Sequence, residues 1–250
     1  MKTTFSIIIP TYNCLHLLRR AINSVYSLSY PSHLFELIVI DGGSNDGTTD
    51  FLMSNSESIR YWVSEPDSGL YEAWNKGISV ALGDWILFLG SDDILHHDAL
   101  TQYNTFILDN PDYDYISAQV SLISSNGSQR TVGKPWVWKH FRHFMRTAHV
   151  ASVHRRDLFT RFGSFSMSYT ACADYEFFLR IGPRLRAGFL PRVVASMTAG
   201  GISQSSFLPL LESRRMKIEL GIISPLRANI DFLYSAVVWL IRRSLLKLAL

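Results

Sequence analysis

Two adjacent carboxylates follow the most apolar segment of the chain. The run Trp85–Leu89 is uninterrupted, and only two residues separate it from Asp92 and Asp93. Such a run is typical of a strand buried on both faces, and paired carboxylates after it are costly unless a cation lies beside them. Carboxylates suit Mg²⁺ or Mn²⁺ held jointly by protein and substrate phosphates. An Asp that caps the next helix is the alternative that this segment leaves open.

Another carboxylate, Asp41, directly follows the β-rich run Phe35–Ile40 and precedes a glycine-rich turn. The glycines do not match the G-x-G-x-x-G dinucleotide fingerprint, and the carboxylate precedes them instead of following about 20 residues later. Asp41 beside glycines that let a ligand approach the backbone suits hydrogen bonds to a nucleoside base. A turn-forming Asp is the structural alternative.

Three charged residues follow the next predicted strand, Tyr61–Ser64. Glu65 and Asp67 lie in a predicted turn, and Lys76 lies on the helix after it. Lys76 can pair with one of these carboxylates or reach a phosphate. The helix is predicted by four apolar residues at helical spacing, Leu70, Trp74, Ile78 and Ala81. Gly83 is predicted to end it.

A further acidic segment begins at Ala173. Asp174 and Glu176 open an apolar run at helical spacing that reaches Arg180. On the local pattern alone, Asp174 is expected to be the N-cap of that helix.

A parallel sheet is the predicted element that brings these residues together. The run Phe5–Pro10 predicts the first strand, which delivers Thr11, Tyr12 and Asn13 to its carboxyl end, where Asn13 is the expected cap of the next helix. Strand, helix and strand predict a right-handed parallel unit whose ligands bind outside the carboxyl ends. Later segments predict a helix at residues 94–108, a strand at 113–120 and an edge strand at 190–197.

Composition predicts one large domain or two intimate lobes. The chain has 250 residues, 47% of them hydrophobic, and a net charge of +3, which is too small to indicate nucleic-acid binding. Cys14 and Cys172 are expected to be buried thiols. The first residues lack the apolar core of a signal peptide, and no run reaches the roughly 20 residues needed to span a bilayer. A cytoplasmic location is expected.

The order of motifs is more specific than any one of them. Taken together, five segments closely resemble glycosyltransferase family two, nearest to bacterial enzymes of the colanic-acid and O-antigen type, from about Phe5 to about Ser205: Pro10–Asn13, Asp41–Ser44, Ser64–Gly69, Asn75–Gly77 and Phe88–Asp93. The resemblance implies an α/β, nucleotide-diphospho-sugar transferase (glycosyltransferase-A) fold with a mostly parallel central sheet flanked by helices. It also implies inverting transfer from a nucleotide sugar, UDP-sugar favoured, with Mn²⁺ or Mg²⁺.

Residue roles follow from the same resemblance. It makes Asp93 the metal ligand and Asp174 the catalytic base, with Glu176 as the second candidate. Gly42 stands where many members of the family have a second Asp. This difference weakens any prediction of which nucleoside base the donor carries. The resemblance also implies eight residues that bind the nucleotide sugar: Pro10, Thr11, Tyr12, Asn13, Asp41, Asp67, Lys76 and Asp92.

The predicted organisation has three parts: a nucleotide-sugar-binding half at 1–110, an acceptor-binding half of the same domain at 111–211, and a helical tail at 212–250. The expected acceptor is a lipid-linked glycan in cell-surface polysaccharide synthesis. A nucleotidyltransferase is disfavoured because it needs a glycine- and arginine-rich loop after its first strand. A catalytically silent, membrane-associated partner that keeps the nucleotide-binding scaffold remains the alternative. A segment at 200–204 matches one that closes over the donor in relatives.

A basic, aromatic window lies between Lys134 and Arg161. It holds seven Lys/Arg, one acid and four of the eight histidines, interleaved with Trp and Phe. A metal site at His140 and His143 and a nucleic-acid stacking surface are both disfavoured. A surface for an anionic acceptor or membrane phosphates competes with a merely solvated face. By resemblance, His149 opens the acceptor-side segment.

The tail from Pro225 is predicted to be an amphipathic helix. Residues 212–250 carry seven Lys/Arg and three Asp/Glu, so the chain's positive excess lies here. The apolar side is expected to pack on the enzyme or a second subunit, or to lie in a membrane interface, which we favour slightly. The enzyme would then be peripheral on the inner face of the membrane.

Overall fold

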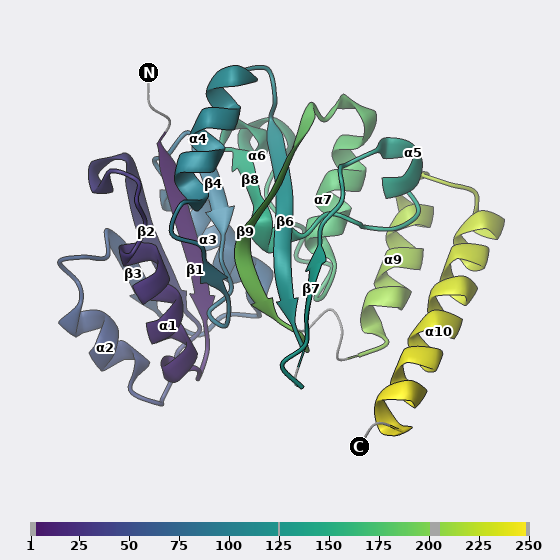
Figure 1. Ribbon diagram of the computed structural model, residues 1–250. Coiled ribbons are helices and arrows are strands. Elements are labelled where there is room, and N and C mark those ends of the chain that lie inside the picture. Colours follow the sequence, from purple (N-terminus) through teal and green to yellow (C-terminus); the bar gives the residue numbers. More distant parts are fainter. Residues whose placement is uncertain (1–3, 125, 201–205, 249–250) are drawn as a thin grey trace.

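The computed structural model describes residues 4–124, 126–200 and 206–248. Within them, one sheet has the strand order β3-β2-β1-β4-β8-β6-β9-β5, with β7 paired to β6 (Figure 1). The strands in chain order are β1 Phe5–Thr11, β2 Phe35–Asp41, β3 Tyr61–Ser64, β4 Trp85–Phe88, β5 Ile94–Leu95, β6 Tyr115–Ile123, β7 Gln129–Val132, β8 Ser152–Arg155 and β9 Ala187–Thr198.

The first half of the sheet is parallel, as predicted. β1 pairs in parallel with both β2 and β4, and β2 with β3. The register places Thr11 opposite Asp41, and Asp41 opposite Ser64. The carboxyl ends of these strands therefore meet at one edge.

The second half is mixed, and two predictions there are wrong. Ile94 and Leu95 form a strand against β9 instead of opening a helix, so the helix begins only at Ala99. Nor is β9 an edge strand, because it lies between β6 and β5. Short apolar segments do not reveal their partners by periodicity, and tertiary pairing decided both.

Helices cover both faces of the sheet. On one face, Ile7 and Ile9 pack with α1 (Leu15–Tyr26), α2 (Thr48–Ser54) and α4 (Ala99–Asp109), while Ile8 faces the opposite core. That opposite core is formed with α3 (Leu70–Val80), α6 (Asp157–Phe162), α7 (Ala173–Ile181) and α9 (Leu208–Glu219). Successive β1 residues thus serve two cores, because side chains alternate between the two faces of a strand.

Two predicted helix ends differ in the structure. Asn13 has φ +48° and its side chain accepts a hydrogen bond from Asn45 N, while Asp46 accepts from Leu15 N at the start of α1. A carboxylate from another loop therefore takes the capping role. α3 ends at Val80, three residues before Gly83. Gly83 is needed for another reason, because its backbone passes close to Phe5.

The remaining helices lie at one side of the molecule. α5 (Trp138–Phe141) is short, and α9 packs beside the long α10 (Pro225–Leu248) as an antiparallel pair at the far side of the fold from β3 (Figure 1). In the described residues, no helix is long and apolar enough to cross a membrane. The predicted closing segment at 200–204 lies largely outside the described residues, which include only Gly200 of it.

Replacing Gly83 by alanine tests the close packing at the start of β4. A Cβ there would lie 2.5 Å from backbone atoms of Phe5 and Ser6, which cannot move without distorting β1. We expect Gly83→Ala to lower the free energy of unfolding by about 1–3 kcal/mol, measured by denaturant titration. Leu82→Ala, at the exposed neighbouring position, is the control and should change little. Equal stability of the two variants would contradict this packing.

Candidate active site

The ends of β1, β2 and β3 are tied together by backbone hydrogen bonds. Gly42 N donates to Thr11 O at 2.9 Å, and Glu65 N donates to Asp41 O at 3.0 Å. Gly42 also lies beneath Asp67, because a Cβ at Gly42 would be 3.1 Å from an Asp67 carboxylate oxygen. The structure thus brings Thr11, Asp41 and Asp67 to one edge, as the parallel sheet predicted.

Asp41 organises this edge from within. Its fully buried carboxylate accepts hydrogen bonds from Ser44 N at 3.0 Å, from the Ser44 hydroxyl and from the Ser64 hydroxyl at 2.6 Å. A carboxylate has about four acceptor positions, so about one remains for a ligand. No local pattern indicates Ser44 and Ser64 as its partners, because both contacts depend on the fold.

A series of polar side-chain contacts joins β1 to the segment after β4. The Cys14 thiol lies 3.2 Å from Thr11 Oγ1 and 3.1 Å from Ser91 Oγ. Cys14 is half-buried, whereas a buried thiol was expected, and that expectation missed these polar contacts. Tyr12 is 63% exposed at the same edge, where an aromatic face is open to solvent.

Lys76 pairs with carboxylates in the structure. Its Nζ lies 2.9 Å from Glu65 and 3.1 Å from Glu72. Of the two uses that its sequence position left open, ion pairing is the one observed. Both carboxylate partners are partly exposed, so the Lys76 ammonium group is held by ion pairs without being buried.

Asp92 and Asp93 crowd over Gly90. A Cβ at Gly90 would lie 2.5 Å from Asp93 Oδ2 and 2.8 Å from Asp92 Oδ1. Asp93 is only 6% exposed; Gly90 N donates to its Oδ2 at 3.2 Å, and the described residues give the buried Oδ1 no partner. Burial, together with the charge of Asp92, raises the pKa of Asp93 to about 7.

Asp174 lies in the first turn of α7 and is not its cap, which is Cys172. The N-cap prediction is therefore wrong. Asp174 Oδ1 accepts hydrogen bonds from the Tyr71 hydroxyl and from Tyr175 N, both at 2.9 Å. Burial and the Asp174 charge raise the pKa of Tyr71, so the phenol stays a donor. Among the described residues, Asp174 Oδ2 has no hydrogen-bond partner.

An aromatic wall connects Asp174 to the strand that carries Asp93. Trp74, one turn after Tyr71 on α3, contacts Phe88 at the end of β4, with ring centroids 4.8 Å apart. His149 stacks against both rings. Burial lowers the pKa of His149, although Asp174 opposes the shift, so the imidazole is neutral at pH 7. Sequence reasoning singled out His149 but missed Tyr71.

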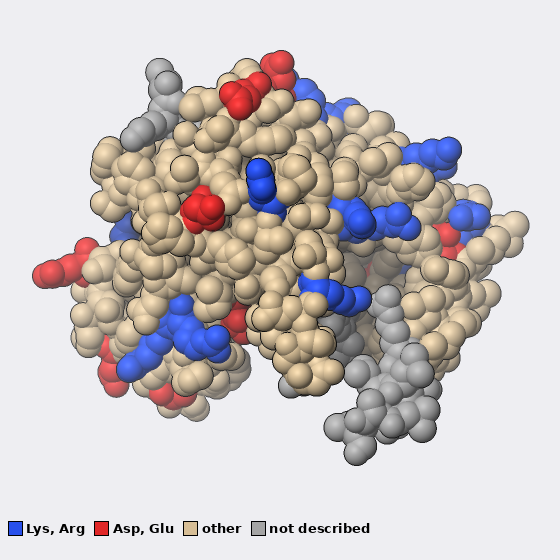
Figure 2. Space-filling model, in the orientation of Figure 1, with Lys and Arg blue, Asp and Glu red and all other residues tan. Residues whose placement is uncertain are grey.

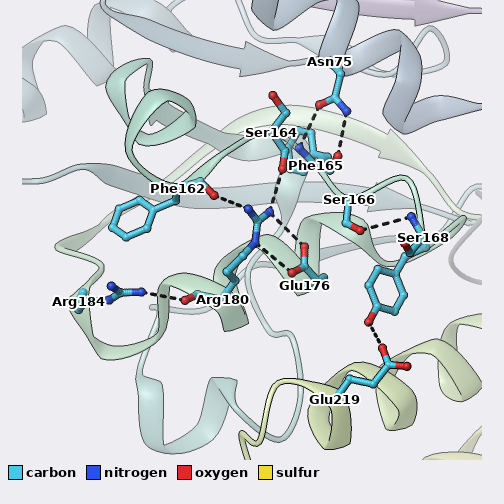
Figure 3. Close-up of polar contacts among 11 residues, drawn as sticks. Asn75, Phe162, Ser164, Phe165, Ser166, Ser168, Glu176, Arg180, Arg184 and Glu219 are labelled. Atoms are coloured by element: carbon cyan, nitrogen blue, oxygen red, sulfur yellow. Dashed lines mark hydrogen bonds and ion pairs between the residues drawn. The ribbon is translucent and has the colours of Figure 1, made fainter.

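Glu176 is engaged elsewhere. Its buried carboxylate accepts two hydrogen bonds from Arg180, one of them from Nε at 3.0 Å (Figure 3). Burial raises the pKa of Glu176, and Arg180 opposes the shift. Arg180 also donates to the carbonyl oxygens of Phe162 and Ser164, so the pair fixes the loop before α7.

The same loop is held by two other elements. Asn75 of α3 donates to Phe165 O at 2.9 Å and accepts from Phe165 N at 3.0 Å (Figure 3). Buried Glu212 of α9 accepts from Thr170 N at 2.7 Å and Ala171 N at 2.9 Å. Asn75, taken from the sequence only as part of a motif, thus joins the two halves of the site.

The histidines of the basic window do not gather. His143 Nδ1 lies 2.7 Å from Asp231 of α10, whereas His149 and His154 lie in the aromatic core. Within the part of the chain that the structure describes, no group of three or more His, Cys, Asp or Glu side chains is arranged to hold a metal ion. Any cation at Asp92 and Asp93 would need further ligands from a substrate.

Comparisons with known proteins show the family and the fold. Residues 6–170 match the family model described as Glycosyl transferase family 2. The chain is 32% identical over 231 residues to the PGL/p-HBAD biosynthesis glycosyltransferase of Mycobacterium tuberculosis, with 88% of each chain covered.

Solved structures share the fold. Staphylococcus aureus TarS 1–349 in complex with UDP-GlcNAc has a TM-score of 0.73 at 18% identity, over 92% of this chain and 70% of that one. The mannosyltransferase PcManGT from Pyrobaculum calidifontis, in complex with GDP-Man and Mn²⁺, has a TM-score of 0.64 at 18% identity, over 99% and 81% of the two chains.

The chain belongs to glycosyltransferase family 2. It is therefore a glycosyltransferase, and the predicted fold class is confirmed.

The titration of Asp93 predicts a pH-dependent stability. Because its folded pKa is raised, the folded protein keeps a proton that the unfolded chain releases, so stability falls as pH rises from about 4 to about 7. Without metal or nucleotide, Asp93→Asn should melt at a higher temperature than wild type near pH 8, and this gain should shrink toward pH 5. Calorimetric scans across this range measure it. A gain independent of pH would contradict the burial of an ionisable Asp93.

Proposed function

We propose that the chain transfers a sugar, with inversion, from a nucleotide-diphospho-sugar to a hydroxyl of a lipid-linked glycan in cell-surface polysaccharide synthesis. The observation that carries the proposal is the Asp92–Asp93 pair at the strand ends, linked through the aromatic wall to a half-buried carboxylate, Asp174. UDP-GlcNAc and GDP-Man in the solved relatives support a nucleotide-sugar donor, and we favour a UDP-sugar.

The donor is assigned to the edge formed by β1, β2 and β3. Exposed Tyr12 offers a face for the nucleoside base, and Thr11 lies opposite Asp41 in the register of the sheet. Pro10 and Asn13 shape the turn after β1. Asp67 lies over Gly42, and we assign it to the part of the donor site nearer the diphosphate. Lys76 would reach a phosphate only by leaving Glu65 and Glu72. In this proposal, residues 1–110 form the donor half and 111–211 the acceptor half.

A divalent cation fits the Asp92–Asp93 pair. The orphaned Asp93 Oδ1 and the mutual repulsion of the two carboxylates are relieved by a cation, with the donor diphosphate and water completing its coordination. We assign Asp93 as the ligand and Asp92 to the ribose and diphosphate. Bound there, Mn²⁺ or Mg²⁺ would neutralise charge on the leaving nucleotide.

Asp174 is the proposed general base. Tyr71 and Tyr175 N fix Oδ1, which leaves Oδ2 to take the proton of an acceptor hydroxyl as that hydroxyl attacks the anomeric carbon. Attack opposite the departing nucleotide inverts the configuration. Glu176 is unsuited to this role because Arg180 holds both of its oxygens.

The acceptor and location remain proposals. The outward apolar face of α10 supports peripheral attachment to the inner face of the cell membrane, where a lipid-linked acceptor would be met. A silent partner that keeps only the nucleotide scaffold is the rival. Product formation by the purified chain separates the two.

Nucleotide titration tests the metal ligand. Calorimetry with UDP, GDP and dTDP, with and without Mn²⁺, should show metal-dependent binding of one nucleotide that Asp93→Ala abolishes. Removing the carboxylate removes a ligand of the cation, whereas Asp109→Ala, an exposed control, should bind as wild type. If no nucleotide binds wild type under any condition, the scaffold has no working donor site.

Turnover tests the base. Asp174→Asn should bind nucleotide normally and lose about 10²–10⁴-fold in kcat, because an amide cannot accept the proton. Glu176→Gln is the comparison and should lower stability more than kcat, since it breaks a buried ion pair. A near-normal kcat in Asp174→Asn would show that the base lies elsewhere.

A further inference from the structure

Helix α10 turns Asp231 inward. This side chain is 2% exposed, and its carboxylate lies beside three basic side chains: His143 Nδ1 at 2.7 Å, Arg227 Nε at 3.2 Å and Lys217 Nζ at 3.8 Å. Fully buried Ala228 lies one turn earlier on this side. These contacts fix the rotation of the helix about its axis.

The opposite side of α10 is a row of exposed apolar side chains, which we call the apolar stripe. Its members recur at helical spacing and are each between 48% and 73% exposed: Leu226, Ile230, Leu233, Tyr234, Val237, Leu240 and Ile241. At about 1.5 Å per residue the stripe runs for more than 20 Å. A continuous apolar surface of this length marks a site of association, unlike single exposed leucines.

Basic residues gather at one edge of the stripe. Lys134, His140 and Arg146 line a shallow pocket whose floor is the buried Phe141. Phe144 joins this region to the stripe, because its ring packs on that of Tyr234 at 5.6 Å. Residues 134–156 contain no acidic residue. Figure 2 shows Lys and Arg side chains over the region of α5.

An apolar row beside a cationic pocket matches the two chemical parts of an anionic lipid. A second copy of the chain is a less suitable partner for the apolar stripe. Two helices that pair in a coiled coil contact each other through a narrow apolar row, with complementary charges on both sides of it. Here the flanking positions hold Arg227, Tyr234 and Ile241 on one side and Asn229, Ala236 and Arg243 on the other. None of them is acidic, so complementary charge pairs cannot form. An in-plane helix instead combines a broad apolar face with nearby Lys and Arg.

We propose that the apolar stripe lies in the headgroup region of an anionic bilayer and that the α5 pocket binds a lipid phosphate. The inference deepens the membrane attachment put forward in the proposed function and names the surface and the lipid chemistry. α9 links this surface to the site, because Glu212 holds the loop before Asp174 while α9 packs on α10.

Vesicle co-sedimentation of the full chain tests the stripe. Wild type should bind phosphatidylcholine vesicles that contain a quarter phosphatidylglycerol. Leu233→Ser combined with Val237→Ser should weaken binding at least about tenfold, since two inserted side chains are lost. Met53→Ser combined with Leu82→Ser removes two equally exposed apolar side chains elsewhere and should bind as wild type.

A second pair of variants tests the pocket. Lys134→Ala combined with Arg146→Ala should weaken binding to the anionic vesicles about 30-fold and leave the weak binding to pure phosphatidylcholine unchanged. Arg20→Ala combined with Arg192→Ala removes the same charge from exposed positions outside the pocket and is the control. Equal losses in both pairs would mean that net charge alone acts, and the pocket assignment would be overturned.

The proposal can fail without affecting the enzymatic one. The proposal would be overturned if the stripe variant bound vesicles as tightly as wild type. It would also be overturned if wild type did not bind vesicles but formed a dimer in light scattering, and the stripe variant did not form that dimer. Nucleotide titration of each variant reports the donor site separately. Unchanged affinity for UDP shows that the variant is folded and that a lost vesicle interaction arises at the surface.

Discussion

The burial of the Asp93 carboxylate beside Asp92 is the constraint on which the site depends. β4 lies inside the sheet with both faces covered, so the side chains that follow it enter a region of low dielectric. Gly90 lets both carboxylates approach, and burial, together with the charge of Asp92, raises the pKa of Asp93 to about 7. A site that disfavours its own negative charge favours a cation, which is the physical basis for placing a diphosphate here.

The acceptor side depends on a loop that no single element could hold. Asn75 of α3, Arg180 of α7 and Glu212 of α9 each bind its backbone, and they come from distant parts of the chain. Their side chains replace the regular hydrogen bonds that a loop lacks, so its buried N–H and C=O groups stay paired. Asp174 follows this loop directly. The geometry of the proposed base is therefore set jointly by the core and by the C-terminal helices.

Local patterns predicted the parallel half of the fold well. Apolar runs such as Phe5–Pro10 and Trp85–Leu89 carry their own signal, because burial on both faces demands it. Predictions failed where a distant partner decided the outcome: Ile94 pairs with β9, and Asp46 takes the capping role expected of Asn13. The same holds for Asp41 and Asp174, whose hydrogen-bond partners Ser64 and Tyr71 lie 23 and 103 residues away along the chain.

By itself, the sequence determined the strand that carries Asp92 and Asp93, the order of the motifs and the amphipathic character of the last helix. These properties follow from residue types at short spacing, which neighbouring residues impose on each other. Only the tertiary structure decided which carboxylates are held by partners, as Glu176 is by Arg180, and which keep an oxygen without a partner among the described residues, as Asp174 does. It also decided that α10 turns Asp231 inward, because His143 and Lys217, which come from other segments of the chain, contact that carboxylate and leave the apolar side exposed.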